Sequence, residues 1–158
     1  MKEITHECHF TQCTVDELSE VDRQLVEAAR EATFKSYAPY SHFYVGAAVR
    51  LDDGTVVTGS NQENAAYPSG LCAERTTLFY ANAQYPDHAV DALAIAARND
   101  NGFIPTPVPP CGACRQVILE TERRYDRPIH ILLYGEQYTL VMDGVAELLP
   151  LIFDGSFL

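Results

Sequence analysis

Two stretches, Leu71-Cys72-Ala73-Glu74-Arg75 and Pro110-Cys111-Gly112-Ala113-Cys114, decide how this chain must fold. Three cysteine thiolates can hold one Zn²⁺ in tetrahedral geometry and leave its fourth position open for water. Zinc lowers the pKa of such a water, and a nearby carboxylate can then transfer protons. The two stretches therefore predict a hydrolytic zinc site with Glu74 as its acid–base group. The expected zinc ligands are Cys72, Cys111 and Cys114.

The spacing of these residues constrains the fold around them. Cys111 and Cys114 are three residues apart at an expected helix start, so their side chains share one face. Cys72 and Glu74 are two residues apart, about 200° around a regular helix. They can both border a metal only if it lies off the N-terminal end of their helix. We therefore expect two helix starts to converge on the zinc, where their partial positive charges offset the surplus charge of three thiolates.

Other interpretations of the cysteines remain open. A closed structural zinc site would need a fourth thiolate or imidazole, which Cys8, Cys13 or a histidine could supply. Residues 111–114 also have the spacing of a thiol–disulfide redox pair, and simple burial is a third alternative. Glu74 favours the hydrolytic site, because none of the three alternatives needs a carboxylate there. Arg75 is expected beside the ligands, where it would reduce thiolate donation to the metal; the alternative is an exposed Arg on a turn.

Composition limits the class of protein. The chain has 158 residues, which fits one domain (residues 1–158) with a sizeable core. Its net charge is −11, so we expect no nucleic-acid partner, because such partners usually need a basic face. No apolar run could span a bilayer, and residues 1–6 lack the apolar segment of a signal peptide, so we expect a cytoplasmic protein without a membrane partner. In a reducing compartment its five cysteines indicate metal binding or catalysis rather than disulfides.

Hydrophobic periodicity predicts an α/β fold. Helices are expected over residues 19–36, 71–84 and 112–124, with a short last helix at 145–149. Strands are expected over residues 43–51, 55–60, 90–97, 129–134 and 138–142. A tight turn at residues 52–54 joins the first two strands as a hairpin. Together these elements predict a three-layer α/β/α arrangement around a mixed five-stranded sheet.

Residues 1–18 form an N-terminal extension to these elements. Within residues 2–13, apolar and soft residues alternate at Ile4, His6, Cys8 and Phe10, which suggests a possible short edge strand. A second metal cluster formed by His6, Cys8, His9 and Cys13 is an alternative, but its spacing fits no standard zinc pattern.

Further stretches carry a resemblance to a known family. They are YAPYSHFYVGAA (37–48), NQENAAYP (61–68), LCAERT (71–76), PCGACRQV (110–117) and ELLP (147–150). Through these blocks the chain resembles the small, homotetrameric cytidine deaminases of pyrimidine salvage. The resemblance implies the cytidine deaminase-like fold, one Zn²⁺ per subunit, Glu74 as the proton shuttle and a homotetramer with shared active sites. The implied reaction is hydrolytic deamination of cytidine and deoxycytidine to uridine and deoxyuridine, with release of ammonia.

The resemblance also implies substrate contacts. Asn61 and Glu63 look like the pair that holds the ribose 3′-hydroxyl, although on their own they would indicate a polar Asx-type turn. Phe43 looks like the aromatic residue packed against the pyrimidine, and the backbone N–H of Ala65 looks like a donor to the base. Tyr67 and Phe153 look like the residues that approach a neighbouring subunit's site.

One departure from the family and two rival functions stay open. Residues 99–110 form a long, proline-rich loop, and Pro109 stands where the family usually has Ser or Thr. One rival is deamination of another aminopyrimidine or a nucleotide, although no glycine-rich loop or basic cluster favours a phosphate. The other is a non-catalytic, zinc-stabilised oligomer or nucleoside-binding module, against which Glu74 counts.

Overall fold

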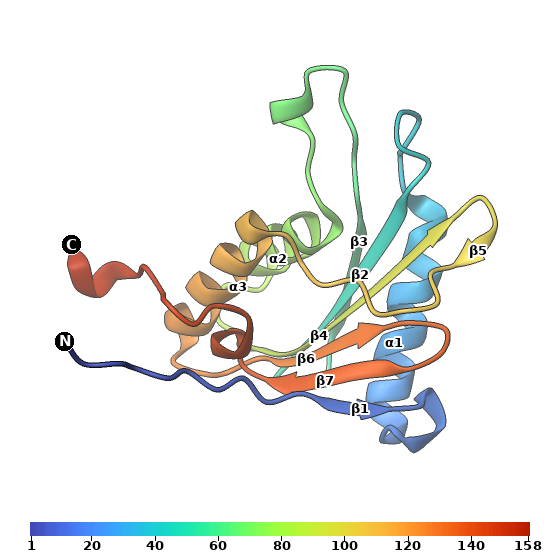
Figure 1. Cartoon of the computed structure of the whole chain (residues 1–158). Helices are drawn as coiled ribbons and strands as arrows, with labels where there is room; N and C mark the ends of the chain where they lie inside the picture. The colour runs from blue at the N-terminus through green and yellow to red at the C-terminus, as the bar shows by residue number, and fades with distance from the viewer.

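The structure is a computed structural model that describes residues 1–158, and it contains a seven-stranded mixed sheet with helices on both faces (Figure 1). Its strands are β1 (Thr11–Cys13), β2 (Tyr44–Leu51), β3 (Val56–Ser60), β4 (Val90–Asn99), β5 (Gly102–Phe103), β6 (His130–Tyr134) and β7 (Thr139–Asp143). Its α-helices are α1 (Glu20–Ala32), α2 (Ala73–Gln84) and α3 (Gly112–Tyr125). No helix combines the length and the apolar character needed to cross a membrane.

The helices form the two outer layers of the fold. α1 covers one face of the sheet, and α2 and α3 cover the other (Figure 1). On the first face Leu25 packs with Ala48, and on the second Leu78 and Ile118 pack with Val49. Ala48 and Val49 point to opposite faces because successive side chains alternate along a strand. The predicted three-layer α/β/α arrangement is therefore confirmed.

Two glycines let the helices approach the sheet closely. A Cβ atom on Gly46 of β2 would overlap the backbone carbonyl of Ala29 in α1. A Cβ atom on Gly59 of β3 would lie 2.5 Å from the Thr77 hydroxyl oxygen in α2. Non-bonded atoms cannot approach as closely as either of these contacts would require. The positions of α1 and α2 against the sheet therefore depend on the absence of a side chain at Gly46 and Gly59.

The topology of the sheet brings two helix starts together. The strand order is β1-β7-β6-β4-β2-β3, and β5 pairs with β4. β2 is antiparallel to both β3 and β4, and β4 is parallel to β6, so β3, β4 and β6 run in the same direction. α2 connects β3 to β4, and α3 connects β4 to β6. Both helices consequently begin at the same end of the sheet, where β3 and β4 have their carboxyl ends, as the spacing of the cysteines requires.

The sheet has two more strands than the five predicted, and one of them, β1, lies in the N-terminal extension where a possible edge strand is expected. β1 pairs with β7 at the sheet edge, but it covers only Thr11–Cys13 and not the alternating residues before it. β5 has two residues and folds back on β4 within the loop expected at residues 99–110. Both strands exist through backbone pairing with a neighbour, which leaves no pattern in their own side chains. The last helix, predicted at residues 145–149, is the 3-10 turn η4 (Val145–Leu148).

Candidate active site

The three predicted zinc ligands lie together at the starts of α2 and α3. Cys72 and Cys111 are the N-cap residues of the two helices, so Cys72 lies just before the first turn in which it was expected. Cys111 Sγ lies 3.8 Å from Cys72 Sγ and 3.5 Å from Cys114 Sγ. Tetrahedral zinc with Zn–S bonds of about 2.3 Å separates its sulfur ligands by about 3.8 Å, so the three Sγ atoms fit one zinc ion. The group contains no fourth Cys or His, unlike a closed structural zinc site.

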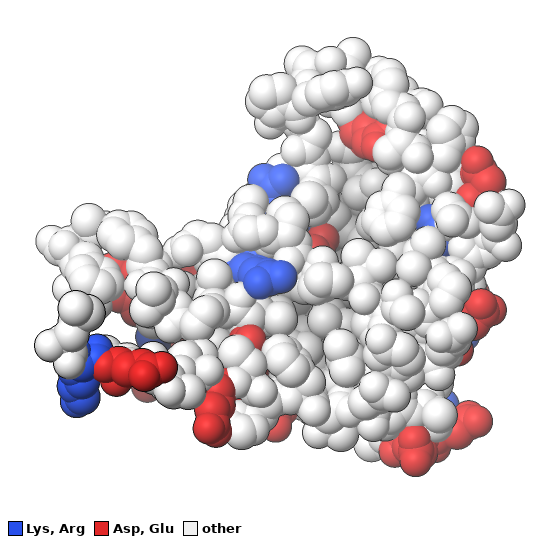
Figure 2. All heavy atoms as spheres, in the orientation of Figure 1, with Lys and Arg blue, Asp and Glu red and all other residues white.

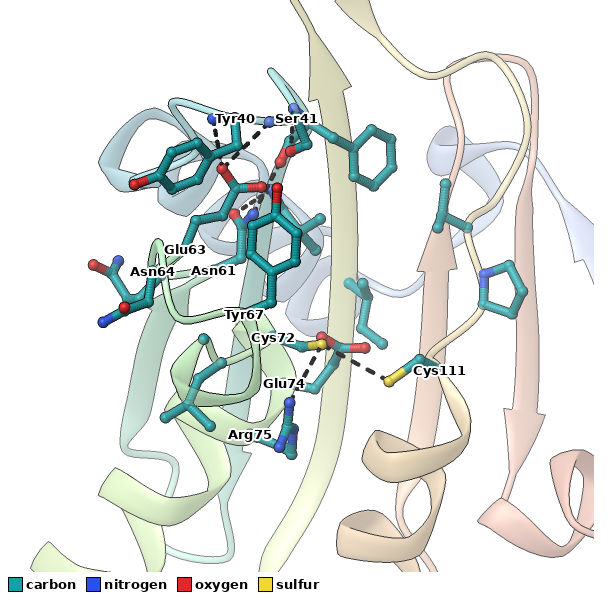
Figure 3. Close-up of a pocket in the computed structure, with 18 residues that line it drawn as sticks. Tyr40, Ser41, Asn61, Glu63, Asn64, Tyr67, Cys72, Glu74, Arg75 and Cys111 are labelled. Carbon is teal, nitrogen blue, oxygen red and sulfur yellow. Dashed lines mark hydrogen bonds between the residues drawn. The ribbon is translucent and has the colours of Figure 1, made fainter.

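Hydrogen bonds among these thiols shift the pKa values of Cys72 and Cys114 in opposite directions. The bond from Cys114, helped by bonds from Arg75 and Cys111, lowers the pKa of Cys72 to about 5. The same bond to Cys72, together with burial, raises the pKa of Cys114. Arg75 Nη2 donates to Cys72 Sγ over 3.8 Å (Figure 3). Arg75 therefore contacts the thiol that most readily becomes a thiolate, the form in which cysteine binds metals.

Glu74 is a buried carboxylic acid in the first turn of α2. Its side chain borders the same space as the cysteines, and Figure 3 shows its carboxyl group beside Cys72. Only 4% of Glu74 is exposed. Burial, reinforced by the negative charge of Cys72, raises the pKa of the Glu74 carboxyl. A carboxyl group with a raised pKa can both accept and donate a proton nearer to neutral pH.

A cleft of about 690 Å³ opens over this group of residues. Figure 2 shows the surface hollowed beneath a projecting part of the molecule, which Figure 1 identifies as the segment between β3 and α2. On this face Lys and Arg side chains do not gather into a continuous patch (Figure 2). The cleft walls come from residues 40–45, from β4, from parts of the segment between β3 and α2, from the start of α2 and from the loop before α3. Four predicted substrate contacts line it, namely Phe43, Asn61, Glu63 and Tyr67.

Asn61 joins the cleft to the start of β2. Its Nδ2 donates to the Phe43 carbonyl at 2.9 Å, and its Oδ1 accepts from the Val45 N–H at 2.9 Å. The side-chain amide is thus held in one orientation by two backbone groups. An amide fixed in this way keeps one N–H and one lone pair for another partner.

Glu63 is held at the rim of the cleft. Its Oε2 accepts from the backbone N–H groups of Tyr40 at 2.8 Å and Ser41 at 3.3 Å (Figure 3). Hydrogen bonds from Ser41 and Tyr40 lower the pKa of Glu63, so the side chain is a carboxylate at neutral pH. Both backbone bonds end on Oε2, and Oε1 stays able to accept a hydroxyl group.

The other predicted substrate contacts have different surroundings. Tyr67 is 77% exposed and packs edge to face against Tyr40, with ring centroids 6.2 Å apart. Ala65 is exposed in the same projecting segment and does not line the cleft. Phe153 lies outside the cleft of its own chain, where it is 60% exposed and stacks on Phe157.

Several residues of the cleft carried no assigned role in the sequence. Tyr40 and Ser41 hold Glu63 through backbone N–H groups, which side-chain patterns do not reveal. Val108 and Pro109 form part of the wall. The sequence singled out Pro109 as a departure from the family, and only the proline-rich composition of the loop pointed to Val108. Ile95 of β4 lines the cleft as well, although its sequence context indicates an ordinary core residue.

Comparison with known proteins identifies similar chains. Residues 19–126 match the family model described as the cytidine and deoxycytidylate deaminase zinc-binding region. A cytidine deaminase of Halalkalibacterium halodurans is 50% identical over 101 residues, which are 63% of this chain and 72% of that protein. A cytidine deaminase of Mycobacterium tuberculosis is 40% identical over 111 residues, 68% and 79% of the two chains. The crystal structure of a cytidine deaminase from Burkholderia pseudomallei superposes with a TM-score of 0.72 at 38% identity, covering 86% of this chain and 100% of that one.

Proposed function

Because the chain belongs to the cytidine and deoxycytidylate deaminase family, we propose that it acts on deoxycytidine as well as cytidine. It is a zinc-dependent enzyme that hydrolyses cytidine to uridine and ammonia, as its relatives named cytidine deaminase indicate. The observation that carries this function is a buried Glu74 carboxyl beside three converging cysteines at the base of a cleft. A closed structural site or a redox pair would not need that carboxyl.

The chemistry divides between the metal and Glu74. When bound by Cys72, Cys111 and Cys114, zinc is a Lewis acid that activates water at neutral pH. Glu74 takes up the proton of the attacking water on its carboxylate. It donates this proton to the ring nitrogen next to C4 while the hydroxide oxygen bonds to C4. Glu74 then takes the proton of the new C4 hydroxyl and passes it to the amine, whose bond to C4 breaks to release ammonia and leave the C4 carbonyl of uridine. Arg75 draws electron density from Cys72 and so limits what this thiolate donates to the metal.

The cleft would hold the nucleoside between its rim and its base. Glu63 Oε1 and the Asn61 amide bind the ribose 3′-hydroxyl, because both groups are already fixed by backbone hydrogen bonds. Phe43 packs against the pyrimidine, and the Ala65 N–H, in the segment that projects over the cleft, would donate to the base. This placement directs C4 of the ring towards Glu74 and the cysteines.

The functional unit is a homotetramer with shared active sites, built from one domain of residues 1–158. β1, in the N-terminal extension, pairs with β7 and thereby joins residues 1–18 to the sheet. Exposed apolar side chains favour an association of subunits. Tyr67 is exposed at the cleft rim, and the C-terminal segment exposes Leu151, Phe153, Phe157 and Leu158. Tyr67 and Phe153 would each reach the site of a neighbour.

A panel of nucleosides assayed for ammonia release tests this function. Cytidine and deoxycytidine should release ammonia, and a zinc chelator should abolish the release. Cytidine 5′-monophosphate should be a poor substrate, because the cleft has no basic cluster. A protein that contains zinc but releases ammonia from no nucleoside would instead be a binding or structural module.

A further inference from the structure

Arg115, in the first turn of α3, makes contacts that neither metal binding nor substrate binding explains. Its Nε donates to the Pro110 carbonyl at 2.9 Å, and its Nη1 donates to the Leu148 carbonyl at 2.8 Å. Pro110 is buried and directly precedes Cys111. One guanidinium group therefore joins the turn that carries a cysteine of the metal group to the end of η4, more than thirty residues further along the chain.

Arg115 holds the backbone of the Cys111 turn through two hydrogen bonds, one from its backbone and one from its side chain. The backbone N–H of Arg115 already donates to the Cys111 carbonyl at 2.9 Å. Arg115 thus binds the carbonyls of two successive residues, one through its backbone and one through its side chain. Rotation of either peptide group would move the Cys111 side chain, so these two bonds limit where Cys111 Sγ can lie. The planar fork of arginine offers two separate donors in fixed directions, which lysine cannot reproduce.

The chain beyond Leu148 is held by the same helix. Gln116 Nε2 donates to the Phe153 carbonyl at 2.9 Å, and Arg123 pairs with Asp154 at 2.9 Å. α3 thereby contacts residues 148–154 through three side chains. Of these three, Arg115 alone also reaches the Cys111 turn.

We propose that Arg115 is a positioning residue that fixes Cys111 for metal binding and couples the Cys111 turn to the C-terminal segment carrying Phe153. This inference rests on Cys111 being a zinc ligand, as in the proposed function. A change at Arg115 should therefore disturb two distant parts of the chain at once, the metal group and residues 149–158.

Zinc affinity of the full-length protein tests the first part. The variants are Arg115→Gln and Arg115→Lys, with Arg124→Gln as a matched control on the same helix. Arg124, near the other end of α3, donates to the Pro86 carbonyl and lies over the Tyr125 ring, and it makes no hydrogen bond to the Cys111 turn or to residues 148–154. Competition with a chromophoric chelator should show zinc binding weakened about 10- to 100-fold in Arg115→Gln, an effect typical of lost partners around metal ligands. Arg115→Lys should fall between that variant and wild type, and Arg124→Gln should match wild type.

Hydrogen exchange tests the second part and needs no catalytic activity. Arg115→Gln should speed exchange in peptides from residues 111–114 and from residues 149–158. Arg123→Gln should speed exchange in residues 149–158 alone. Wild-type zinc affinity in Arg115→Gln, or exchange that rises evenly over the whole chain, would overturn the proposal. If Arg115→Gln does not fold, Arg115→Lys decides by the same two measurements.

The two proposals can fail separately. A wild-type protein that binds zinc but does not deaminate cytidine contradicts the proposed function, and the affinity and exchange results still decide the role of Arg115.

Discussion

Glu74 meets two demands that usually exclude each other. Burial keeps its carboxyl away from solvent, and yet the same side chain borders the cleft where a substrate must lie. Its position in the first turn of α2, two residues after Cys72, satisfies both demands. The Glu74 carboxyl can transfer protons only if it can ionise. A substitution that removes this ionisation should therefore stop catalysis and leave metal binding intact.

Glu74→Gln preserves the size of the side chain and removes its ability to carry a proton. We expect kcat for cytidine to fall by about 10²–10⁴-fold, the range that a positioned acid–base group contributes. Zinc content should stay at one ion per subunit, because the three cysteines are unchanged. Glu120→Gln, an exposed position on α3, is the control and should behave as wild type. Substantial cytidine turnover by Glu74→Gln, measured by ammonia release, would contradict the assignment.

Glu63→Gln tests whether the rim carboxylate recognises the ribose. A hydrogen bond to a charged group contributes about 1.5–3 kcal/mol, so wild type should prefer cytidine over 3′-deoxycytidine by about 10- to 150-fold in kcat/KM. The variant should lose most of this preference while its activity on 3′-deoxycytidine changes little. A glutamine oxygen can still accept from the Tyr40 N–H, so the turn itself is retained. An equal loss on both nucleosides would indicate a structural role for Glu63 instead.

At the scale of single residues, the sequence predicts the groups that act through side-chain chemistry. The Cys-x-Glu and Pro-Cys-x-x-Cys spacings identify Cys72, Glu74 and Cys111 because metal ligation requires particular atoms at particular separations. Backbone groups have no such signature. The N–H donors of Tyr40 and Ser41 that hold Glu63 are present in every non-proline residue, and only the folded chain shows which ones meet a carboxylate.

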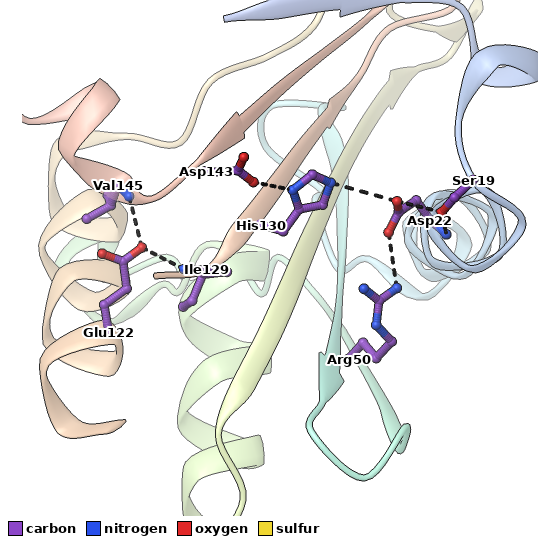
Figure 4. Close-up of polar contacts among 8 residues, drawn as sticks. All are labelled: Ser19, Asp22, Arg50, Glu122, Ile129, His130, Asp143 and Val145. Atoms are coloured by element: carbon purple, nitrogen blue, oxygen red, sulfur yellow. Dashed lines mark hydrogen bonds and ion pairs between the residues drawn. The ribbon is translucent and has the colours of Figure 1, made fainter. Parts of the chain in front are cut away.

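Residues with no part in the chemistry determine how the helices are placed against the sheet and the neighbouring segments. Gly46 allows α1 to approach β2, and Glu122 connects three elements at the other side of the sheet. Glu122 Oε1 accepts from the Ile129 N–H at 3.0 Å and the Val145 N–H at 2.9 Å (Figure 4). Asp22 of α1 plays a similar part, accepting from Arg50 of β2 at 3.1 Å (Figure 4).

Gly46→Ala should separate α1 from the sheet. The added methyl group would overlap the Ala29 carbonyl, which is backbone and cannot move without the helix. Overpacking of this kind lowers the free energy of unfolding by about 1–3 kcal/mol, which denaturant titration can measure. Gly155→Ala, where no atom lies within 4 Å of the new Cβ, is the control and should leave stability nearly unchanged. Unchanged stability in Gly46→Ala would mean that α1 can shift at little cost.

Glu122 predicts a dependence of stability on pH. Burial raises the pKa of Glu122 in the folded protein above its value in the unfolded chain. Ionisation is therefore less favourable in the folded state, and this carboxyl contributes less to stability as the pH rises through its folded pKa. Glu122→Gln still accepts the two N–H groups and removes the ionisation, so it should unfold at a higher denaturant concentration than wild type at pH 8. The difference should shrink as the pH falls towards 4.

Glu122→Ala is the matched variant that removes the acceptor as well. It should lower the free energy of unfolding by roughly 1–3 kcal/mol for each N–H group left without a partner. If Glu122→Gln is less stable than wild type at pH 8, the ionised carboxylate is the better partner, and the expected sign is wrong.

The elements that the sequence predicts well are those with their own periodic pattern. α1, the β2–β3 hairpin and β4 carry apolar residues at helical or strand spacing, and each lies within a few residues of its predicted bounds. β5 could not be predicted, because its two residues become a strand only by pairing with β4. The same reason explains why the edge strand lies at Thr11–Cys13 and not over the alternating residues that precede it.

At the scale of the whole molecule, two of the groups of exposed apolar side chains bear on how subunits could assemble. Tyr67 and Tyr40 are exposed at the rim of the cleft, and the C-terminal segment exposes Phe153 and Phe157. A sequence reveals only which residues are apolar, and the structure of one chain shows that these ones are not covered by its own fold. Both groups agree with the proposed tetramer.

Mixing two inactive variants tests whether sites are shared. Glu74→Gln lacks its own proton shuttle, and Phe153→Ala would lack the aromatic group that it gives to a neighbour. Co-expressed subunits that assemble at random should rebuild complete sites at roughly one quarter of positions, so the mixture should exceed the activity of either variant alone. Light scattering should report tetramers for all three samples. No gain in activity from mixed tetramers would place Phe153 outside the neighbour's site.

The shared direction of β3, β4 and β6 has a consequence for how new specificities could arise. The reacting groups belong to the starts of α2 and α3, which pack on the sheet, α2 through its close contact with Gly59. Most groups proposed to recognise the nucleoside belong to the connection before α2, residues 61–71, and the connection before α3 forms part of the cleft wall at Val108 and Pro109. Insertions or replacements in either connection can therefore retarget the enzyme to other aminated rings without redesign of its reaction centre.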